Sequence, residues 1–277
     1  MLLLSPKEVL RLKLETLGLP SLRELCVRMG LDKRGNSSEL IKRVIAHAPS
    51  AVVIDQFIKD KYLAIIKERE NLITTGELKT ELGKVKEFSW GVVQGQLDNK
   101  IQAQYVRNHV RYDDLIRDVK KQLHDDITSY VICTWYNHWT TILIEEYISQ
   151  HRNVIPTLKN VKGIDIFFDG QPFDLKTTYL PKEYVYSEAV ANPKALIVWL
   201  YENQGAPRFG GDNRLYIVLY DSQNPEDRWK LKRDFELIAN RVDDFLDAEK
   251  VGSQDEIVFS YERKTYTAIS KLLFITK

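Results

Sequence analysis

The segment from Gly163 to Leu180 constrains the fold of this chain more than any other. It consists of an apolar run, a cluster of turn-forming residues and a second apolar run: Ile164–Phe168, Asp169–Pro172 and Phe173–Leu180. Apolar runs of strand length on both sides of a turn predict a β-hairpin. Because proline has no amide hydrogen for the strand ladder, we expect Pro172 to stay in a loop of residues 169–172. A shorter loop at Asp169-Gly170 is the alternative.

Three charged residues interrupt the two apolar strands: Asp165, Asp174 and Lys176. Side chains alternate between the faces of a strand, so either loop places all three on one face. The longer loop puts Asp165 opposite Lys176, and the shorter loop puts it opposite Asp174. Neighbouring carboxylates repel each other, and a divalent cation removes that conflict. Mg²⁺ suits such a pair, because it prefers oxygen ligands and keeps several waters.

This hairpin resembles the active-site hairpin of the PD-(D/E)xK nuclease superfamily. In that resemblance Asp165 is the first acid, Asp174 is the second, and Lys176 positions or deprotonates the attacking water. The proline that often precedes the first acid is absent, since Ile164 stands there. An acid and a lysine two residues apart are common on solvated strand edges. An aspartate inside Ile-Asp-Ile-Phe-Phe is not explained in that way.

Composition narrows the function classes. The chain has 277 residues, of which 44% are apolar and 29% charged, as in a globular protein with a sizeable core. Its net charge is +1, so a surface for nucleic acid must be local. Cys26 and Cys133 are predicted to be buried thiols. The opening Met-Leu-Leu-Leu is too short for the core of a signal peptide, and no apolar run approaches the length of a membrane span, so we expect a cytoplasmic protein.

The motifs of zinc sites and of serine hydrolases are both missing from the sequence. The histidines and cysteines do not have the spacing of a zinc site, and no Gly-x-Ser-x-Gly elbow occurs. We interpret His138 as a helix residue with a local hydrogen bond and not as a general base. Zinc hydrolases and serine hydrolases are therefore not expected.

Residues 1–50 predict a small helical module. Capping boxes at Ser21 and Asn36 each indicate the start of a helix, and the loop Asp32-Lys33-Arg34-Gly35 lies between them. Nine basic and five acidic residues give the module a net charge of +4. The module resembles the SAP-type helix-extended-loop-helix unit that binds DNA. That resemblance implies these phosphate contacts: Lys33, Arg34, Lys42 and Arg43. A solvated helical face is the alternative.

A linker at residues 48–51 separates this module from a second region, which extends to residue 128. Helical periodicity is present over Val52–Glu70 and Asp98–Tyr130. Acids interleave with its arginines and lysines, which favours a salt-bridged surface. We expect this region to clamp DNA or to join two subunits. The predicted domains are therefore 1–50, 51–128 and 129–277.

The third region is predicted to alternate helices and strands. The patterns predict a long helix over Ser129–Gln150, buried strands over Ala195–Tyr201 and Arg214–Tyr220, an amphipathic helix over Glu226–Leu246, and a closing hairpin of Glu256–Tyr261 and Tyr266–Ile275. Together with these patterns, the resemblance of the hairpin to the PD-(D/E)xK nucleases implies an α/β (α+β) protein with a restriction-endonuclease-like core, in which helices flank a central mixed sheet.

A helix with a glutamate before the acidic hairpin is the order of the superfamily core. With Asn-His-Trp-Thr-Thr, Val-Ile-Pro-Thr and Pro-Phe-Asp-Leu-Lys, residues 135–220 resemble a group of restriction-type endonucleases. At about 100° per residue, Glu146 lies inside the apolar stripe, where a carboxylate needs a partner, and Glu145 lies on the polar edge. The resemblance points to Glu145 as the acid that assists Asp165 and Asp174, with Glu146 as the alternative.

The resemblance, with the acids and the lysine of the hairpin, implies an Mg²⁺-dependent type II restriction endonuclease that cuts double-stranded DNA at a specific sequence. A repair or junction nuclease on the same core and an inactive DNA-binding protein are the alternatives. The intact set of Asp165, Asp174 and Lys176 argues against the inactive form. Cutting both strands normally needs two active sites, which favours a homodimer. A companion DNA methyltransferase acting on the same sequence is a further expected partner.

Overall fold

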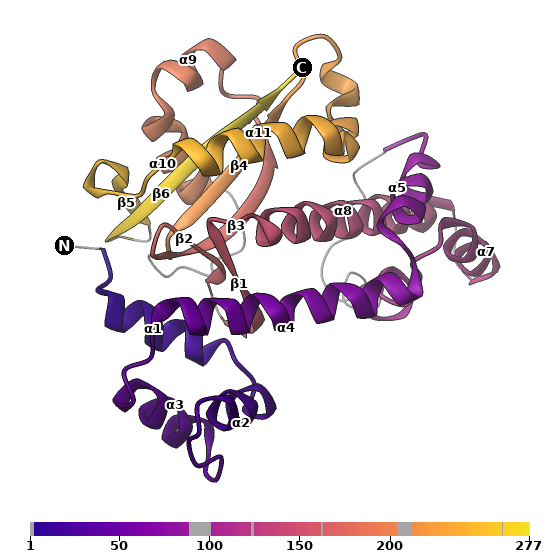
Figure 1. Cartoon of the computed structure of the whole chain (residues 1–277). Coiled ribbons are helices and arrows are strands. Elements are labelled where there is room, and N and C mark those ends of the chain that lie inside the picture. Colours follow the sequence, from indigo (N-terminus) through magenta and orange to yellow (C-terminus); the bar gives the residue numbers. More distant parts are fainter. Residues whose placement is uncertain (1–2, 89–100, 123–124, 162, 204–211, 262) are drawn as a thin grey trace. The chain divides into compact units, whose positions relative to one another are not determined.

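The computed structural model describes residues 3–88, 101–122, 125–161, 163–203, 212–261 and 263–277. Over these residues the chain is an α/β protein, with a helical N-terminal region followed by a six-stranded mixed sheet and flanking helices (Figure 1). The expected fold class is therefore confirmed. The chain divides into two compact units: residues 1–64, 148–220 and 240–277 in the first, and residues 65–147 and 221–239 in the second.

Three helices open the first unit: α1 (Pro6–Glu15), α2 (Leu19–Arg28) and α3 (Ser37–Ala46). The capping box at Asn36 is confirmed, because its side chain accepts from the Glu39 amide and Glu39 bonds back. The box at Ser21 was a wrong prediction, since the N-cap of α2 is Gly18, three residues earlier. A proline in the first turn explains the earlier start, because its fixed φ suits a helix and its missing amide needs no partner there.

The module's core continues into later parts of the first unit. Leucines of α1–α3 pack with Ile54, Phe57 and Ile58, which lie early in α4 (Ala51–Leu72). Ile155 and Leu158 pack against the same cluster, and both belong to β1 (Val154–Val161). The amino-terminal helices therefore share apolar contacts with the edge of the sheet.

The second unit is helical over its described residues. Besides the later part of α4, its elements are α5 (Thr75–Gly83), the π-helix η1 (Gln102–Val106), α7 (Tyr112–Gln122), most of α8 (Asp125–Gln150) and the 3₁₀-helix η2 (Pro225–Arg233). Tyr136 of α8 donates its hydroxyl to the Trp229 carbonyl of η2, and Phe88 stacks on the Trp229 ring. The predicted long helix is confirmed. The sequence places a Gly- and Trp-containing join near Phe88–Gly95, between the two helical patterns, and residues 89–100 lie outside the described residues.

The sheet has the order β1-β2-β3-β4-β6-β5. Its remaining strands are β2 (Ile164–Phe168), β3 (Gln171–Tyr179), β4 (Arg214–Tyr220), β5 (Glu256–Tyr261) and β6 (Lys264–Thr276). Strands β1, β2 and β3 are antiparallel neighbours, β3, β4 and β6 run parallel, and β5 closes an antiparallel hairpin with β6. The closing hairpin and the strand at Arg214–Tyr220 are both confirmed.

The β2–β3 hairpin forms with the shorter loop. Phe168 pairs with Gln171, and Asp169 and Gly170 have φ of 45° and 73°. Positive φ at both central positions is the type I′ turn that Asp-Gly favours. The expected longer loop was wrong because Pro172 loses no ladder bond. The pair after the closing pair in such a hairpin is not hydrogen-bonded, and pairing with β4 begins only at Asp174.

The run Ala195–Tyr201 was wrongly predicted to be a strand. It belongs to helix α10 (Pro193–Asn203), which with α9 (Tyr186–Ala191) connects β3 to its parallel neighbour β4. Leu196, Leu200 and Tyr201 are buried at helical spacing in the core that α10 shares with β4, β5 and β6. The run reads as continuous because Val198 and Trp199, on the other side of the helix, are also partly buried.

The predicted helix over Glu226–Leu246 is two elements. Its first part is the 3₁₀-helix η2, and its second part is α11 (Phe235–Ala248), which begins after Asp234. The Asp234 carboxylate accepts from the Leu237 amide, so this residue separates the two. Phe245 of α11 packs against Phe168 at the end of β2, which places this helix on the hairpin.

Candidate active site on the acidic hairpin

The structure brings Asp165, Asp174 and Lys176 together. Lys176 Nζ lies 2.7 Å from Asp174 Oδ1, and the carboxyl groups of Asp165 and Asp174 lie close enough to interact electrostatically. The Leu175 amide donates to Asp165 Oδ2 at 2.8 Å. The register that pairs Ile166 with Phe173 explains this arrangement, since one further step places Asp165 opposite Asp174.

Burial and the neighbouring carboxylate make Asp165 hard to ionise. Its pKa is raised to about 6, mainly because the side chain is removed from water and also because Asp174 lies beside it. The Leu175 amide and the Lys176 ammonium act in the opposite direction. Two acids in this state need positive charge nearby, and the structure supplies part of it from Lys176.

A second cation, Arg214, also lies at Asp174, and the sequence did not single it out. The parallel pairing of β3 and β4 sets Arg214 directly beside Asp174, with Nε 3.4 Å from Oδ2. The guanidinium lies 4.5 Å from the ring centre of Tyr201, and Nη1 donates to the Tyr216 hydroxyl at 3.0 Å. The only sequence signal was an arginine at the start of an otherwise apolar run.

Both tyrosines stay protonated at neutral pH. Burial raises the pKa of Tyr216 to about 12, although Arg214 opposes this, and burial also raises the pKa of Tyr201. The Tyr201 hydroxyl donates to the Asp212 carbonyl at 2.8 Å. Tyr201 comes from α10, so the helix that was predicted to be a strand forms part of this site.

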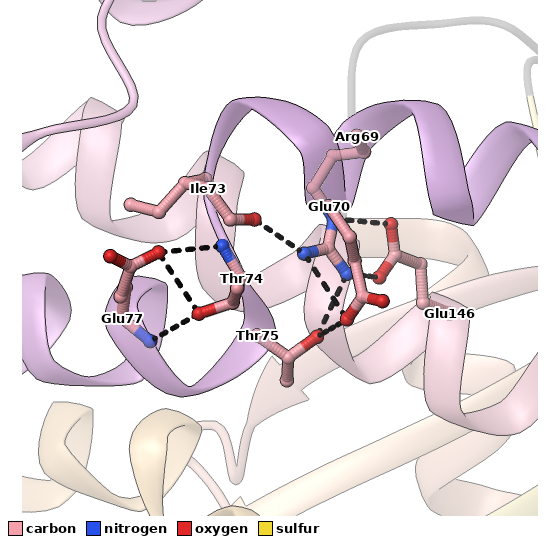
Figure 2. Close-up of polar contacts among 7 residues, drawn as sticks. All are labelled: Arg69, Glu70, Ile73, Thr74, Thr75, Glu77 and Glu146. Atoms are coloured by element: carbon pink, nitrogen blue, oxygen red, sulfur yellow. Dashed lines mark hydrogen bonds and ion pairs between the residues drawn. The ribbon is translucent and has the colours of Figure 1, made fainter.

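The two helix acids have different surroundings, and both lie in the second unit. Glu146 is 13% exposed and forms a two-point ion pair with Arg69, in which Nε lies 3.1 Å from Oε1 and Nη2 lies 2.5 Å from Oε2 (Figure 2). Arg69 also donates to the Ile73 carbonyl and the Thr75 hydroxyl. Glu146 is therefore held by a structural partner. Glu145 is half-buried, and its part in the chemistry stays a prediction.

Of the four predicted phosphate contacts, three have exposed side chains and one is bonded within its own loop. Lys33 and Lys42 are exposed, and Arg34 is exposed but bonded to Asp32. Arg43 points into its own loop, where Nη1 donates to the carbonyls of Asp32 and Arg34. These two bonds stabilise the loop between α2 and α3.

Arg23 is a basic residue of the module that the sequence did not single out. With Lys33 and Arg34 it lines a pocket of about 430 Å³, whose other lining residues are Glu24 and the exposed Val27. Three cations from α2 and the loop thus surround one hollow. A phosphate group is the kind of ligand that such a surface attracts.

The donor set at the hairpin fits a hard divalent cation. Two carboxylates meet there, and Mg²⁺ is usually held by one or two carboxylates plus waters and phosphate oxygens. Over the described part of the chain, His, Cys, Asp and Glu nowhere form a group of three or more with metal-site geometry. A site with water and substrate as the remaining ligands is therefore the kind of metal centre these residues suit.

The described residues include no helix that is long and apolar enough to span a membrane. Comparisons of the chain with protein-family models, with curated proteins and with solved structures find no match. The site's own geometry is therefore the basis for a functional conclusion.

Proposed function

We propose that this protein is an Mg²⁺-dependent DNA endonuclease of restriction type, which cuts double-stranded DNA at a specific sequence. The observation that carries the proposal is the meeting of the Asp165 and Asp174 carboxyl groups with the Lys176 ammonium at the open end of the hairpin. The order of elements supports it, since a long helix precedes the acidic hairpin, as in the nuclease core that the sequence resembles.

In this proposal Asp165 and Asp174 hold the metal ion, and Glu145 assists them. A bound Mg²⁺ supplies positive charge for the phosphate oxygens and makes an attacking water more acidic. Lys176 positions or deprotonates that water, or stabilises charge on phosphorus. Its side chain is 45% exposed, so it can turn from Asp174 towards a substrate. Asp165 stays next to the backbone through its bond from Leu175.

Double-stranded DNA is the proposed partner, and the basic loop of the amino-terminal module is the proposed contact with its backbone. A homodimer would supply the two active sites that cutting both strands normally needs. A methyltransferase that protects the same sequence belongs to the same proposal. No described contact tests either partner.

Lys176→Ala tests the chemistry. We expect cleavage of unmethylated phage DNA with Mg²⁺ to fall by roughly 10²–10⁴-fold, because the variant loses the group that positions or deprotonates the attacking water. Asp174→Ala should behave in the same way. Lys250→Ala is the matched control, since this exposed lysine lies beside Asp169 at the other end of the hairpin. It should cut like the unmodified protein.

Circular dichroism and DNA binding in Ca²⁺ check that the variants are folded. Full cleavage by a folded Lys176→Ala protein would refute the proposal. Discrete bands from long DNA indicate sequence specificity, whereas cleavage confined to branched or damaged duplexes indicates the junction or repair alternative.

A further inference from the structure

We infer that Arg214 is a positioning residue for Asp174 and that its charge sets how tightly the two carboxylates bind a divalent cation. This inference rests on the proposed function, because it concerns the same metal site. It assigns a role to a residue that the acid–acid–lysine pattern does not contain.

The two oxygens of Asp174 face two cations that differ in mobility. Lys176 Nζ is 2.7 Å from Oδ1 on a side chain that is 45% exposed. Arg214 Nε is 3.4 Å from Oδ2, and the Arg214 side chain is 11% exposed. Lys176 can turn into solvent when a substrate arrives. Arg214 is enclosed, so it stays at Asp174.

Contacts on several sides hold the guanidinium in place. The Tyr201 ring lies 4.5 Å from it, and the Tyr216 hydroxyl accepts from Nη1 at 3.0 Å. The strand pairing fixes its backbone beside Asp174 in β3 and beside Ser270 in β6. Both tyrosines are neutral at physiological pH, so Asp174 is the charged group that this surrounding offers. A guanidinium removed from water keeps such a partner, because separating the pair leaves a buried charge.

The fixed positive charge has two opposite consequences for the site. It orients Asp174 and lowers the repulsion between Asp174 and Asp165 when the metal is absent. It also remains close to any divalent cation that the carboxylates bind, and like charges in a half-buried site repel strongly. Arg214 therefore gives a preformed site at the expense of affinity for the cation.

Replacing Arg214 with a neutral residue should therefore tighten metal binding while slowing cleavage. We expect the Kd for Mn²⁺, measured by isothermal titration calorimetry without DNA, to fall by about fivefold or more in Arg214→Met, since the repelling charge is gone. Arg214→Lys keeps the charge, and its Kd should stay within about twofold of the unmodified protein. A merely structural role would weaken Mn²⁺ binding in both variants.

Lys271→Met is the matched control. Lys271 lies one residue further along β6 than Ser270, so its side chain leaves the opposite face of the sheet, where it pairs with Glu249 and Asp255. Its removal should not change the Kd for Mn²⁺. Arg214→Gln, which can still bond to Tyr216, replaces Arg214→Met if thermal melting shows that the Met variant is unfolded.

Asp174→Asn separates the inference from the function it rests on. If the unmodified protein binds no Mn²⁺ in a way that depends on Asp174, both the proposed function and the inference fail. If it binds Mn²⁺ but the neutral variants at residue 214 bind equally or more weakly, only the inference is overturned. A change in Kd of clearly more than about twofold for Arg214→Lys would also overturn it.

Discussion

Arg69 is the partner that the carboxylate of Glu146 needs in its apolar surroundings. The apolar surroundings of Glu146 in the sequence indicated that its carboxylate needs a partner, and the structure provides Arg69, which lies 77 residues away along the chain. Four atoms accept from the Arg69 side chain: both Glu146 oxygens, the Ile73 carbonyl and the Thr75 hydroxyl (Figure 2). Glu146 thus has a sufficient structural role, and Glu145 remains the candidate for the chemistry.

Glu146→Gln should therefore lower the stability of the protein, whereas Glu145→Gln should impair cleavage. Removing one partner of a buried ion pair costs about 3–5 kcal/mol, so we expect Glu146→Gln to lower the free energy of unfolding by roughly that amount. Its folded fraction should still cut DNA. Glu145→Gln should keep most of its stability but need much more Mg²⁺. Urea unfolding and cleavage across a Mg²⁺ titration measure the two effects, and the reverse ranking would move the site to Glu146.

Lys232 is a second buried charged residue, and its burial should make the free energy of unfolding depend on pH. Its residue is 7% exposed, and Nζ donates to Asn137 Oδ1 at 2.9 Å. Burial lowers the pKa of this ammonium to about 8, whereas an unfolded lysine titrates near about 10.4. Between those values the unfolded chain binds more protons, so stability rises with pH. Below the folded pKa the cost of burying the charge is fully present.

The Lys232 contribution to the free energy of unfolding should rise by roughly 2 kcal/mol between about pH 7.5 and 9.5, because each pKa unit corresponds to about 1.36 kcal/mol. Lys232→Met should remove that rise and be the more stable protein at the lower pH. Lys230→Met is the control, since Lys230 is half-exposed and paired with Asp227. Equal pH dependence in Lys232→Met and the unmodified protein, measured by urea unfolding, would contradict the prediction.

At the scale of elements, α10 shows why a short apolar run is ambiguous. A strand buried on both faces and a helix buried on most sides both produce continuous apolar residues. Pro193 was the local signal that favoured the helix, because proline suits a first helical turn. In the hairpin, too, the local signal was present, since Asp169-Gly170 favours the two-residue turn that forms and Pro172 is compatible with it.

The loop between α2 and α3 contains Lys33, a proposed DNA contact, and is supported by Arg43. Lys33→Ala should weaken binding to a labelled duplex and reduce the slope of log affinity against log salt by about 0.9, since one phosphate contact is lost. Arg43→Ala should instead lower stability by about 1–2 kcal/mol, because the Asp32 and Arg34 carbonyls lose their donor. Fluorescence anisotropy in Ca²⁺ and urea unfolding measure these effects.

Lys7→Ala is the control for the loop variants, because Lys7 is exposed on α1, outside the loop. It should match the unmodified protein in both assays. An unchanged salt slope in Lys33→Ala would show that the loop serves a partner other than DNA.

At the scale of the whole molecule, the two compact units do not follow the order of the chain. Three separate segments build the first unit, and two build the second. The amino-terminal helices contact the sheet in two ways. Leu4 exchanges backbone bonds with the Gln171 side chain, and Ile155 and Leu158 of β1 pack on the helical core. Removing the module would therefore expose apolar surface on the sheet.

The sequence by itself determined the features that depend on local geometry. Alternation along a strand placed Asp165, Asp174 and Lys176 on one face, whichever loop the hairpin used. Helical periodicity predicted α8, and strand-length apolar runs predicted the β5–β6 hairpin. Each follows from how the backbone repeats over a few residues, so neighbouring residues are enough to specify it.

Only the tertiary structure decided which distant groups meet. Arg214 reaches Asp174 because two strands 40 positions apart pair in parallel, and Glu146 of α8 meets Arg69 of α4, which is 77 residues away along the chain. Those pairings depend on burying apolar surface across the whole fold, and a local pattern carries no record of them. The acids and the lysine of the site were therefore readable from the sequence, whereas the buried arginine and tyrosines beside them were not.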